Sequence, residues 1–351
     1  MRSVRINLTP RVVAGQRIEA VDELKGLAIG LVILYHGGAA AGFANTFHGE
    51  IGVDIFLILS GFALALNSAN MPLRQFFLRR FVRIYPSYWI ALGLFLWMSK
   101  RYYGATRSWE NIWQHVLGIQ GFSRLLYFAD IVDAFWFISM IIAAYVVFAC
   151  IRKRLDDLSL IFAVAGSLTV FATVMYGHNN HWGGLISVAP RVTSFFGGVI
   201  AGRLLGSGTA EIRFNLALGL GLLCFYYQTF FLGQASNYTL PAFGIILTWV
   251  ALRPYLQRYR SGKVVTSAFA MMGVISYEVY LFHQPFVRDY NNYFFIRVLQ
   301  IANPTRSELL GGVFAGLAVA VAISVVVHKS LEWIYARFGR SQTLRPVAVH
   351  A

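Results

Sequence analysis

The sequence predicts an all-α, polytopic membrane protein, and three observations support this class. First, 57% of its 351 residues are hydrophobic and only 13% are charged, with a mean hydropathy of +0.59. A soluble domain of this length cannot bury that much apolar surface. Second, the apolar residues form long runs with the length of membrane-spanning helices. Third, Lys and Arg gather in short clusters between these runs, as the ends of membrane helices require.

The apolar runs predict a bundle of about ten transmembrane helices. They cover residues 24–43, 51–68, 84–99, 131–149, 158–176, 188–206, 213–232, 238–255, 266–287 and 308–328. The first run follows a basic leader and contains small residues, which is also the pattern of a signal peptide. A retained helix is the better interpretation, because the run is about 20 residues long and can span a bilayer.

Positive charge predicts the orientation of this bundle. If the N-terminus is cytoplasmic, 22 of the 30 Lys and Arg residues fall in cytoplasmic segments. The positive-inside rule then places both termini in the cytoplasm. Residues 1–340 are expected to form one membrane domain, followed by a short tail over 341–351. The longest outer connection, residues 100–130, is expected to be a lid or an interfacial segment.

Composition also argues against several functions. The net charge of +15 does not indicate a nucleic-acid partner, because the basic residues do not cluster on one soluble face. Cys150 and Cys224 are isolated and give neither a disulfide framework nor a zinc motif. His178 and His181 have a metal-like spacing in an outer loop but lack a third ligand, so no metal is expected.

Ionisable residues inside the apolar runs are the candidates for function, since each costs a few kcal/mol, roughly 2.5–3.5 for Asp at a helix centre. His36 follows Lys25 by 11 residues, so it lies about 17 Å along a helix, near the bilayer midplane. It is either a proton-transfer group or a packed histidine bonded to a neighbouring helix. Asp54 begins the second run within about two turns of His36 in depth. It is either the partner of His36 or a carboxylate at a helix N-terminus.

Other polar positions allow two interpretations as well. Arg80 and Arg83 lie one turn apart and either anchor the cytoplasmic end of a helix or bind phosphate. Glu278 and His283 lie within the ninth run, and Trp136 and Ser139 open the fourth; each pair either packs or contributes to a site. Ser60 and Gly61 indicate close helix packing.

Four stretches, in this order, resemble the acyltransferase-3 family of integral membrane O-acyltransferases: VDELKGLAIGLVILYH, GVDIFLILSGFAL, FFLRRFVRIYPSYW and SYEVYLFHQPF. The resemblance extends from Val21 to about Phe286 and is densest in the first 90 residues. It implies a bundle of ten or eleven helices that transfers an acyl group, usually acetyl, from cytoplasmic acyl-CoA to a hydroxyl. The hydroxyl most often belongs to a saccharide of the envelope or an exported polysaccharide.

The resemblance also implies roles for individual residues. His36 matches the family's essential histidine, with Asp54 as its expected catalytic partner. The expected acyl-CoA ligands are Lys25, Arg80 and Arg83. The expected acceptor contacts are Trp136, Ser139, Glu278, Tyr280 and His283. Acetyl-CoA is the expected donor substrate, the expected membrane is the bacterial inner membrane, and neither a metal nor a nucleic acid is expected.

The sequence departs from the family pattern at two positions. Lys25 stands where many members have Arg, which keeps the charge but loses the bidentate fork. Many members also have a glutamate shortly after the tryptophan and serine of the fourth run, and this chain has none there. The role of that carboxylate is either vacant here or filled elsewhere, by Glu50 or Glu278.

Two other functions fit the same residues. A transporter or flippase of a lipid-linked saccharide also needs intramembrane ionisable groups. An acyltransferase acting on a lipid or small molecule would share the whole donor site. Direct transfer by a general base and an acyl-histidine intermediate are both compatible with His36.

Overall fold

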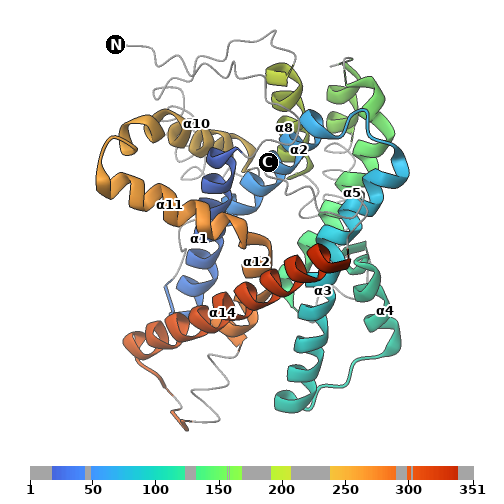
Figure 1. Ribbon diagram of the computed structural model, residues 1–351. Helices are drawn as coiled ribbons and strands as arrows, with labels where there is room; N and C mark the ends of the chain where they lie inside the picture. The colour runs from blue at the N-terminus through green and yellow to red at the C-terminus, as the bar shows by residue number, and fades with distance from the viewer. Residues whose placement is uncertain are drawn as a thin grey trace.

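The computed structural model describes residues 18–43, 49–122, 132–155, 157, 159–167, 191–206, 238–289, 299–301 and 303–338 (Figure 1). The long helices are α1 (Glu19–Ala40), α2 (Ile51–Asn67), α3 (Leu73–Tyr103), α5 (Trp136–Ile151), α8 (Val192–Gly206), α10 (Thr239–Leu256), α11 (Arg260–Val274) and α14 (Arg306–Phe338). The shorter elements are α4 (Trp109–Leu117), α12 (Ser276–Gln284), the 3-10 turns η1 (Gln120–Phe122), η2 (Asp133–Phe135) and η3 (Arg152–Arg154), and the π-helical turn η5 (Pro285–Asp289). Residues 159–167 are also helical.

The predicted all-α class is confirmed for the described residues, where every element above is a helix. Within the described ranges, four helices are long and apolar enough to cross a membrane, namely α3, α5, α10 and α14. A fifth span results if α11 and α12 form one broken span, and α2 and α8 are apolar but shorter. The predicted span 213–232 and the second half of 158–176 lie outside the described residues. The number ten and the orientation therefore remain predictions.

Helix α3 begins earlier than the predicted span 84–99. It starts directly after Pro72 and ends at Gly104, which adopts the left-handed conformation with φ of 62°. A glycine in this conformation is a common helix C-terminus because it lacks a Cβ. The arginine cluster therefore lies within the first turns of the helix, where it lowers the local hydropathy and hides the helix start.

The predicted span 266–287 is not one continuous helix, because α11 and α12 meet at an angle of 73°. The hydroxyl of Ser276 donates to the carbonyl oxygen of Gly273 at 2.8 Å, a local bond that competes with regular helix geometry. Beyond α12, the backbone continues as the π-helical turn η5, starting at Pro285. Such turns are frequent at functional sites.

Small residues set the closest helix contacts. A Cβ added at Gly61 of α2 would lie 2.0 Å from the carbonyl oxygen of Phe195 in α8, and one at Gly198 would lie 2.0 Å from that of Ile58. The backbones of α2 and α8 therefore touch, which confirms the packing role predicted for Gly61. Gly26 of α1 meets the backbone of α11 in the same way. Close backbone approach through glycine is typical of helix packing in membranes.

Helix α12 lies in the centre of the bundle. In Figure 1, α1 and α3 run through the view from top to bottom, and α14 crosses both obliquely. Helix α12 packs against α1, α3 and α14, and eight of its nine residues are buried. The main apolar core joins α12 to α1, α2, α3, α5, α8 and α14. A polar side chain on α12 is therefore held inside the protein.

Candidate functional site

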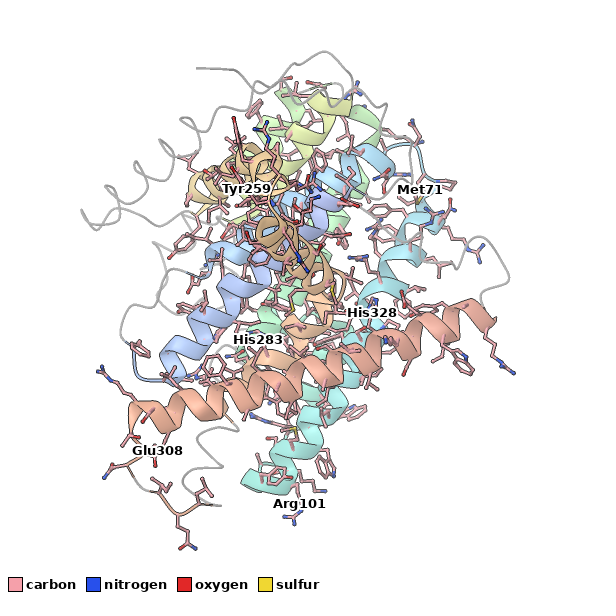
Figure 2. The ribbon with its side chains drawn as sticks, turned by 60° about the vertical axis from the view of Figure 1, so that its left-hand side comes forward. Met71, Arg101, Tyr259, His283, Glu308 and His328 are labelled. Atoms are coloured by element: carbon pink, nitrogen blue, oxygen red, sulfur yellow. The ribbon has the colours of Figure 1, made fainter. Side chains whose placement is uncertain are left out.

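Two predicted site residues from opposite ends of the sequence meet in the interior. His36 of α1 and His283 of α12 have ring centroids 5.0 Å apart, with the ring planes inclined by 52°. His283 has an exposed fraction of 0%, and Figure 2 shows it between α1 and α14. The side chain of Tyr35 packs edge-on against His36. Helices α1 and α12 thus place two imidazoles in contact, one fully buried and one half-buried.

The hydrogen bonds of His283 define its protonation pattern. Its Nδ1 lies 2.8 Å from the carbonyl oxygen of Tyr280. A carbonyl oxygen can only accept, so we assign the proton to Nδ1. The Nε2 of the neutral ring is then an acceptor. Within the described residues this buried atom has no hydrogen-bond partner.

The turn η2 fixes α12 beside the start of α5. The hydroxyl of Tyr280 donates to the carbonyl oxygen of Ala134 at 2.8 Å. The amide of Ala134 donates to Oε1 of Gln284 at 2.6 Å. These bonds lie on either side of His283 in the sequence of α12. Tyr280, predicted as an acceptor contact, therefore holds α12 against η2.

The predicted residues of the fourth run separate into two environments. Ser139 is buried, and its hydroxyl accepts a bond from the amide of Gly121 at 2.9 Å, which fixes the turn η1. Trp136 lies under the guanidinium of Arg191, with its ring centroid 5.5 Å from Cζ. The predicted outer connection leads into this region, because Gly118 packs against Ile138 and Ile142 of α5.

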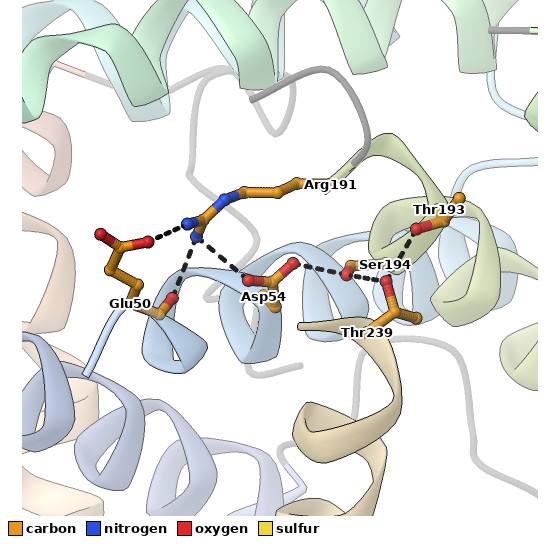
Figure 3. Close-up of polar contacts among 6 residues, drawn as sticks. All are labelled: Glu50, Asp54, Arg191, Thr193, Ser194 and Thr239. Carbon is orange, nitrogen blue, oxygen red and sulfur yellow. Dashed lines mark hydrogen bonds and ion pairs between the residues drawn. The ribbon is translucent and has the colours of Figure 1, made fainter. Parts of the chain in front are cut away.

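Arg191 joins the N-terminal ends of α2, α8 and α10 (Figure 3). Its Nη1 donates to Oδ2 of Asp54 at 3.1 Å, and its Nη2 forms an ion pair with Glu50. The hydroxyl of Ser194 donates to the other Asp54 oxygen at 2.6 Å and contacts Thr239. The two carboxylates compensate the buried guanidinium, as a charge in a membrane protein requires.

The predicted pairing of Asp54 with His36 is therefore replaced by a different arrangement. Both carboxylate oxygens of Asp54 bind groups of the Arg191 segment. Arg191 escaped the sequence analysis because it was counted among the basic residues of outer loops and spans. Arg191 stands directly before an apolar run, at the same predicted depth in the membrane as the start of the run that contains Asp54. This position was the feature of the sequence that could have identified it.

A second polar group surrounds Glu278 on α12. The hydroxyl of Ser87 in α3 donates to Oε1 of Glu278 at 3.0 Å, and Nδ1 of His328 in α14 lies 3.5 Å from Oε2. Figure 2 shows His328 on α14 beside the bundle. His328 was not predicted, because it falls at the final residue of the predicted span 308–328.

The predicted acyl-CoA ligands differ in exposure. The guanidinium of Arg80 lies over the rings of Phe76 and Tyr145, with Cζ 5.7 and 5.6 Å from their centroids. Arg83 is exposed one turn further along α3, and its charge acts on His328. The Nζ of Lys25 lies 3.5 Å from Oδ1 of Asp22. Both arginines lie on α3, but the side chain of Arg80 is held against α5, whereas that of Arg83 is exposed.

Helix α12 links the arginine side of the bundle to the histidine pair. Glu278, beside Ser87 and His328, precedes His283 by five residues, which is about 7.5 Å along a helix axis. The charge of Arg83 acts on His328, the partner of Glu278. Helix α12 therefore carries two separate polar groups, Glu278 with Ser87 and His328, and His283 with His36.

The family model named Acyl_transf_3, described as an acyltransferase domain, matches residues 18–327. The chain belongs to the acyltransferase-3 family. It is therefore an acyltransferase, and the family and its apolar helices make it a membrane protein. The described members of the site, from His36 to His328, lie inside the matched region or at its edge.

Two curated proteins show similarity to this acyltransferase-3 chain. One is the putative membrane-bound transacylase BcsY of Komagataeibacter xylinus, 25% identical over 337 residues, covering 88% of this chain and 81% of the relative. The other is the peptidoglycan O-acetyltransferase OatA of Listeria monocytogenes, 33% identical over 82 residues, covering 21% of this chain and 12% of the relative. No solved structure matches the chain.

The two expected substitutes for the absent glutamate of the acyltransferase-3 pattern can be located. Glu50, one expected substitute for the absent glutamate, binds Arg191, which also covers Trp136. Glu278, the other, lies on the Ser87 side of α12. Glu50 is thus the carboxylate connected to the tryptophan motif. His178 and His181 lie outside the described residues.

Proposed function

We propose that this chain is an O-acyltransferase of the bacterial inner membrane. It transfers an acyl group, acetyl by preference, from cytoplasmic acyl-CoA to a hydroxyl of an envelope or exported saccharide. Family membership supports acyl transfer. The name of the Listeria relative, a peptidoglycan O-acetyltransferase, supports oxygen as the acceptor atom and a saccharide polymer as the acceptor class.

The contact between His36 and His283 is the observation on which the proposal depends. A thioester and an alcohol react slowly unless a base removes the hydroxyl proton as the bond forms. A half-buried imidazole suits this task because it exchanges protons near neutral pH. His36 is the proposed base, and its position in α1 lets donor and acceptor approach from opposite ends.

Donor binding is assigned to the basic residues at the N-terminal ends of α1 and α3. Arg83 is exposed and suited to phosphate, and Arg80 and Lys25 complete the proposed ligand set. The pantetheine arm would then follow α12 past Glu278 toward the histidine pair. The acceptor would enter near Trp136 and the Arg191 group. The hydroxyl oxygen attacks the thioester carbon, and CoA leaves as its thiol.

The decisive test uses purified protein with acetyl-CoA and a saccharide acceptor, and it measures the release of free CoA thiol. His36→Gln should lower the rate by a factor of about 10²–10⁴, the usual contribution of a general base. His115→Gln is the matched control, since His115 is another buried histidine with its Nδ1 at a backbone carbonyl. Arg83→Ala should raise KM for acetyl-CoA more than KM for the acceptor.

Two results would overturn the proposal. Full activity of the His36→Gln protein would remove its chemical basis. Absence of any thiol release by the native protein with saccharide, lipid and small-molecule acceptors would favour the transporter that the sequence left open. Mass spectrometry of surface glycans with and without the gene would identify the acceptor, because a mass difference of one acyl unit identifies both the donor's acyl group and the product.

A further inference from the structure

We propose that His283 is the proton partner of His36: its Nε2 accepts a hydrogen bond from the His36 ring and shares the proton during acyl transfer. The inference rests on the proposed function and assigns a proton-sharing role to a residue for which the sequence predicted only an acceptor contact. It depends on three observations, namely an unpartnered buried nitrogen, a ring contact and the engagement of Asp54 elsewhere.

The buried nitrogen is the first observation. The carbonyl oxygen of Tyr280 holds the proton of His283 on Nδ1, so the lone pair of Nε2 is free to accept. A buried polar atom without a partner costs about 1–3 kcal/mol. Among the described residues Nε2 has no partner. An unpaired acceptor at such a cost indicates a group that meets its donor during function.

The ring contact identifies the donor. The His36 ring is the imidazole against His283, with centroids 5.0 Å apart. Two imidazoles at this distance touch, and the terminal side-chain torsion of histidine is broad. In the proposed arrangement, a rotation of the His36 side chain aims one of its ring nitrogens at Nε2. Catalytic hydrogen bonds are often long or misaligned before substrate binds.

The position of Asp54 explains why a histidine fills this role. In a triad, a carboxylate orients the base and stabilises its imidazolium form. Here the carboxylate is committed to Arg191 and Ser194. A neutral histidine orients the base without placing another formal charge in the apolar interior, where charges are expensive. The arrangement keeps the resting pair uncharged.

The charges around His36 and His283 favour sharing of the proton between the two rings. Among the described residues, the polar groups that act on the pair include Tyr35 on α1, Tyr280 on α12 and Arg288 on η5. The positive charge of Arg288 acts on His36 and opposes the formation of an imidazolium there. Spreading the incoming proton over two rings reduces this repulsion.

The proton balance of the step is simple. One nitrogen of His36 takes the hydroxyl proton of the acceptor as its oxygen forms the ester bond to the acyl carbon. The proton on the other His36 nitrogen moves toward Nε2 of His283, so both rings carry the positive charge. The carbon–sulfur bond breaks, and the CoA thiolate takes one proton back from the pair. Both histidines end neutral, and no oxidant or additional reactant is needed.

Two substitutions at His283 distinguish proton sharing from packing. In His283→Asn, the amide nitrogen can still donate to the Tyr280 carbonyl, but nothing remains at the Nε2 position. In His283→Gln, an amide oxygen can reach that position and accept a hydrogen bond, but it cannot hold a proton at neutral pH. The control is again His115→Gln. Thermal unfolding and acetyl-CoA binding show whether each protein is folded.

Single-turnover transfer should be measured in H2O and D2O, because this isolates the chemical step. We expect both His283 variants to bind acetyl-CoA as the native protein does and to react about 10- to 100-fold more slowly, the usual effect of losing the partner of a functional histidine. A plot of the native rate against the deuterium fraction of the solvent should be curved, because two protons move in the proposed step. The Gln variant should give a straight line.

Native rates in either variant would overturn the inference, as would a curved dependence retained in His283→Gln. If the Asn variant is slow and the Gln variant reacts at the native rate, His283 acts only as a hydrogen-bond acceptor. This result would also refute proton sharing. Failure of the proposed function gives a different result, since the native protein itself would release no CoA thiol in the same assay.

Discussion

Asp54 and His36 show which residues the buried ionisable side chains of this protein interact with. Both were recognised as ionisable positions inside apolar runs, and their similar predicted depth suggested a pair. In the structure Asp54 binds Arg191 and Ser194, while His36 contacts His283. An arginine is the stronger competitor for a buried carboxylate, because it compensates the charge and donates several hydrogen bonds.

Substitution of Asp54 should therefore act mainly on stability. Asp54→Asn removes one of the two carboxylates of Arg191, and breaking a buried pair costs about 3–5 kcal/mol. Glu50→Gln is the comparison, because Glu50 is partly exposed and its loss should cost less. Thermal unfolding in detergent should show a clearly lower midpoint for Asp54→Asn. An unchanged midpoint with abolished transfer would instead make Asp54 a catalytic residue.

The sequence singled out several candidate residues but not most of the residues that contact them. His36, Glu278 and His283 stand out because a polar group within an apolar run is costly. Their partners do not stand out. Arg191 lies at the start of a helix, where basic residues are ordinary, and serines such as Ser87 are common in packed helices. The carbonyl oxygen of Tyr280 belongs to the backbone, so the sequence gives no sign of its contact.

At the scale of elements, glycine contacts fix how the helices cross. A Cβ on Gly26 of α1 would lie 1.9 Å from the carbonyl oxygen of Phe269 in α11. Gly26→Ala must separate the two helices, and overpacking of this kind typically costs about 1–3 kcal/mol. Gly30→Ala, one turn later on α1, is the matched control, since a Cβ there meets nothing within 4 Å.

The measurement for this pair is thermal unfolding together with transfer activity. Gly26→Ala should lower both, because α11 continues into α12 and its histidine. Gly30→Ala should be neutral or slightly stabilising, as alanine favours the helix over glycine by about 1 kcal/mol. Equal behaviour of the two variants would show that the α1–α11 contact does not position α12.

Element boundaries were predictable where hydropathy changes abruptly and not elsewhere. The start of α2 and both ends of α10 fall within a residue of the predicted runs. The start of α3 was missed because Arg79, Arg80 and Arg83 lower the local hydropathy within a continuous helix. The bend before α12 was missed because the hydrogen bond from Ser276 to the Gly273 carbonyl is a local feature with no periodic signal in the sequence.

For the whole molecule, the testable prediction is its orientation in the bilayer. The distribution of Lys and Arg predicts that both termini are cytoplasmic. Reporter fusions active only in the cytoplasm should be active at the N-terminus and after the last helix. A fusion after Lys100 should report the opposite side. Termini on opposite sides would contradict the even number of spans and reverse the proposed donor and acceptor entrances.

The backbone of Ala134 has a wider significance than its small side chain suggests. Its amide and carbonyl are both taken by α12, by Gln284 and Tyr280, around the buried imidazole. The direction of that imidazole is thus inherited from the chain leading into α5. Any shift of Ala134 would therefore be passed to α12 and to the ring that it carries.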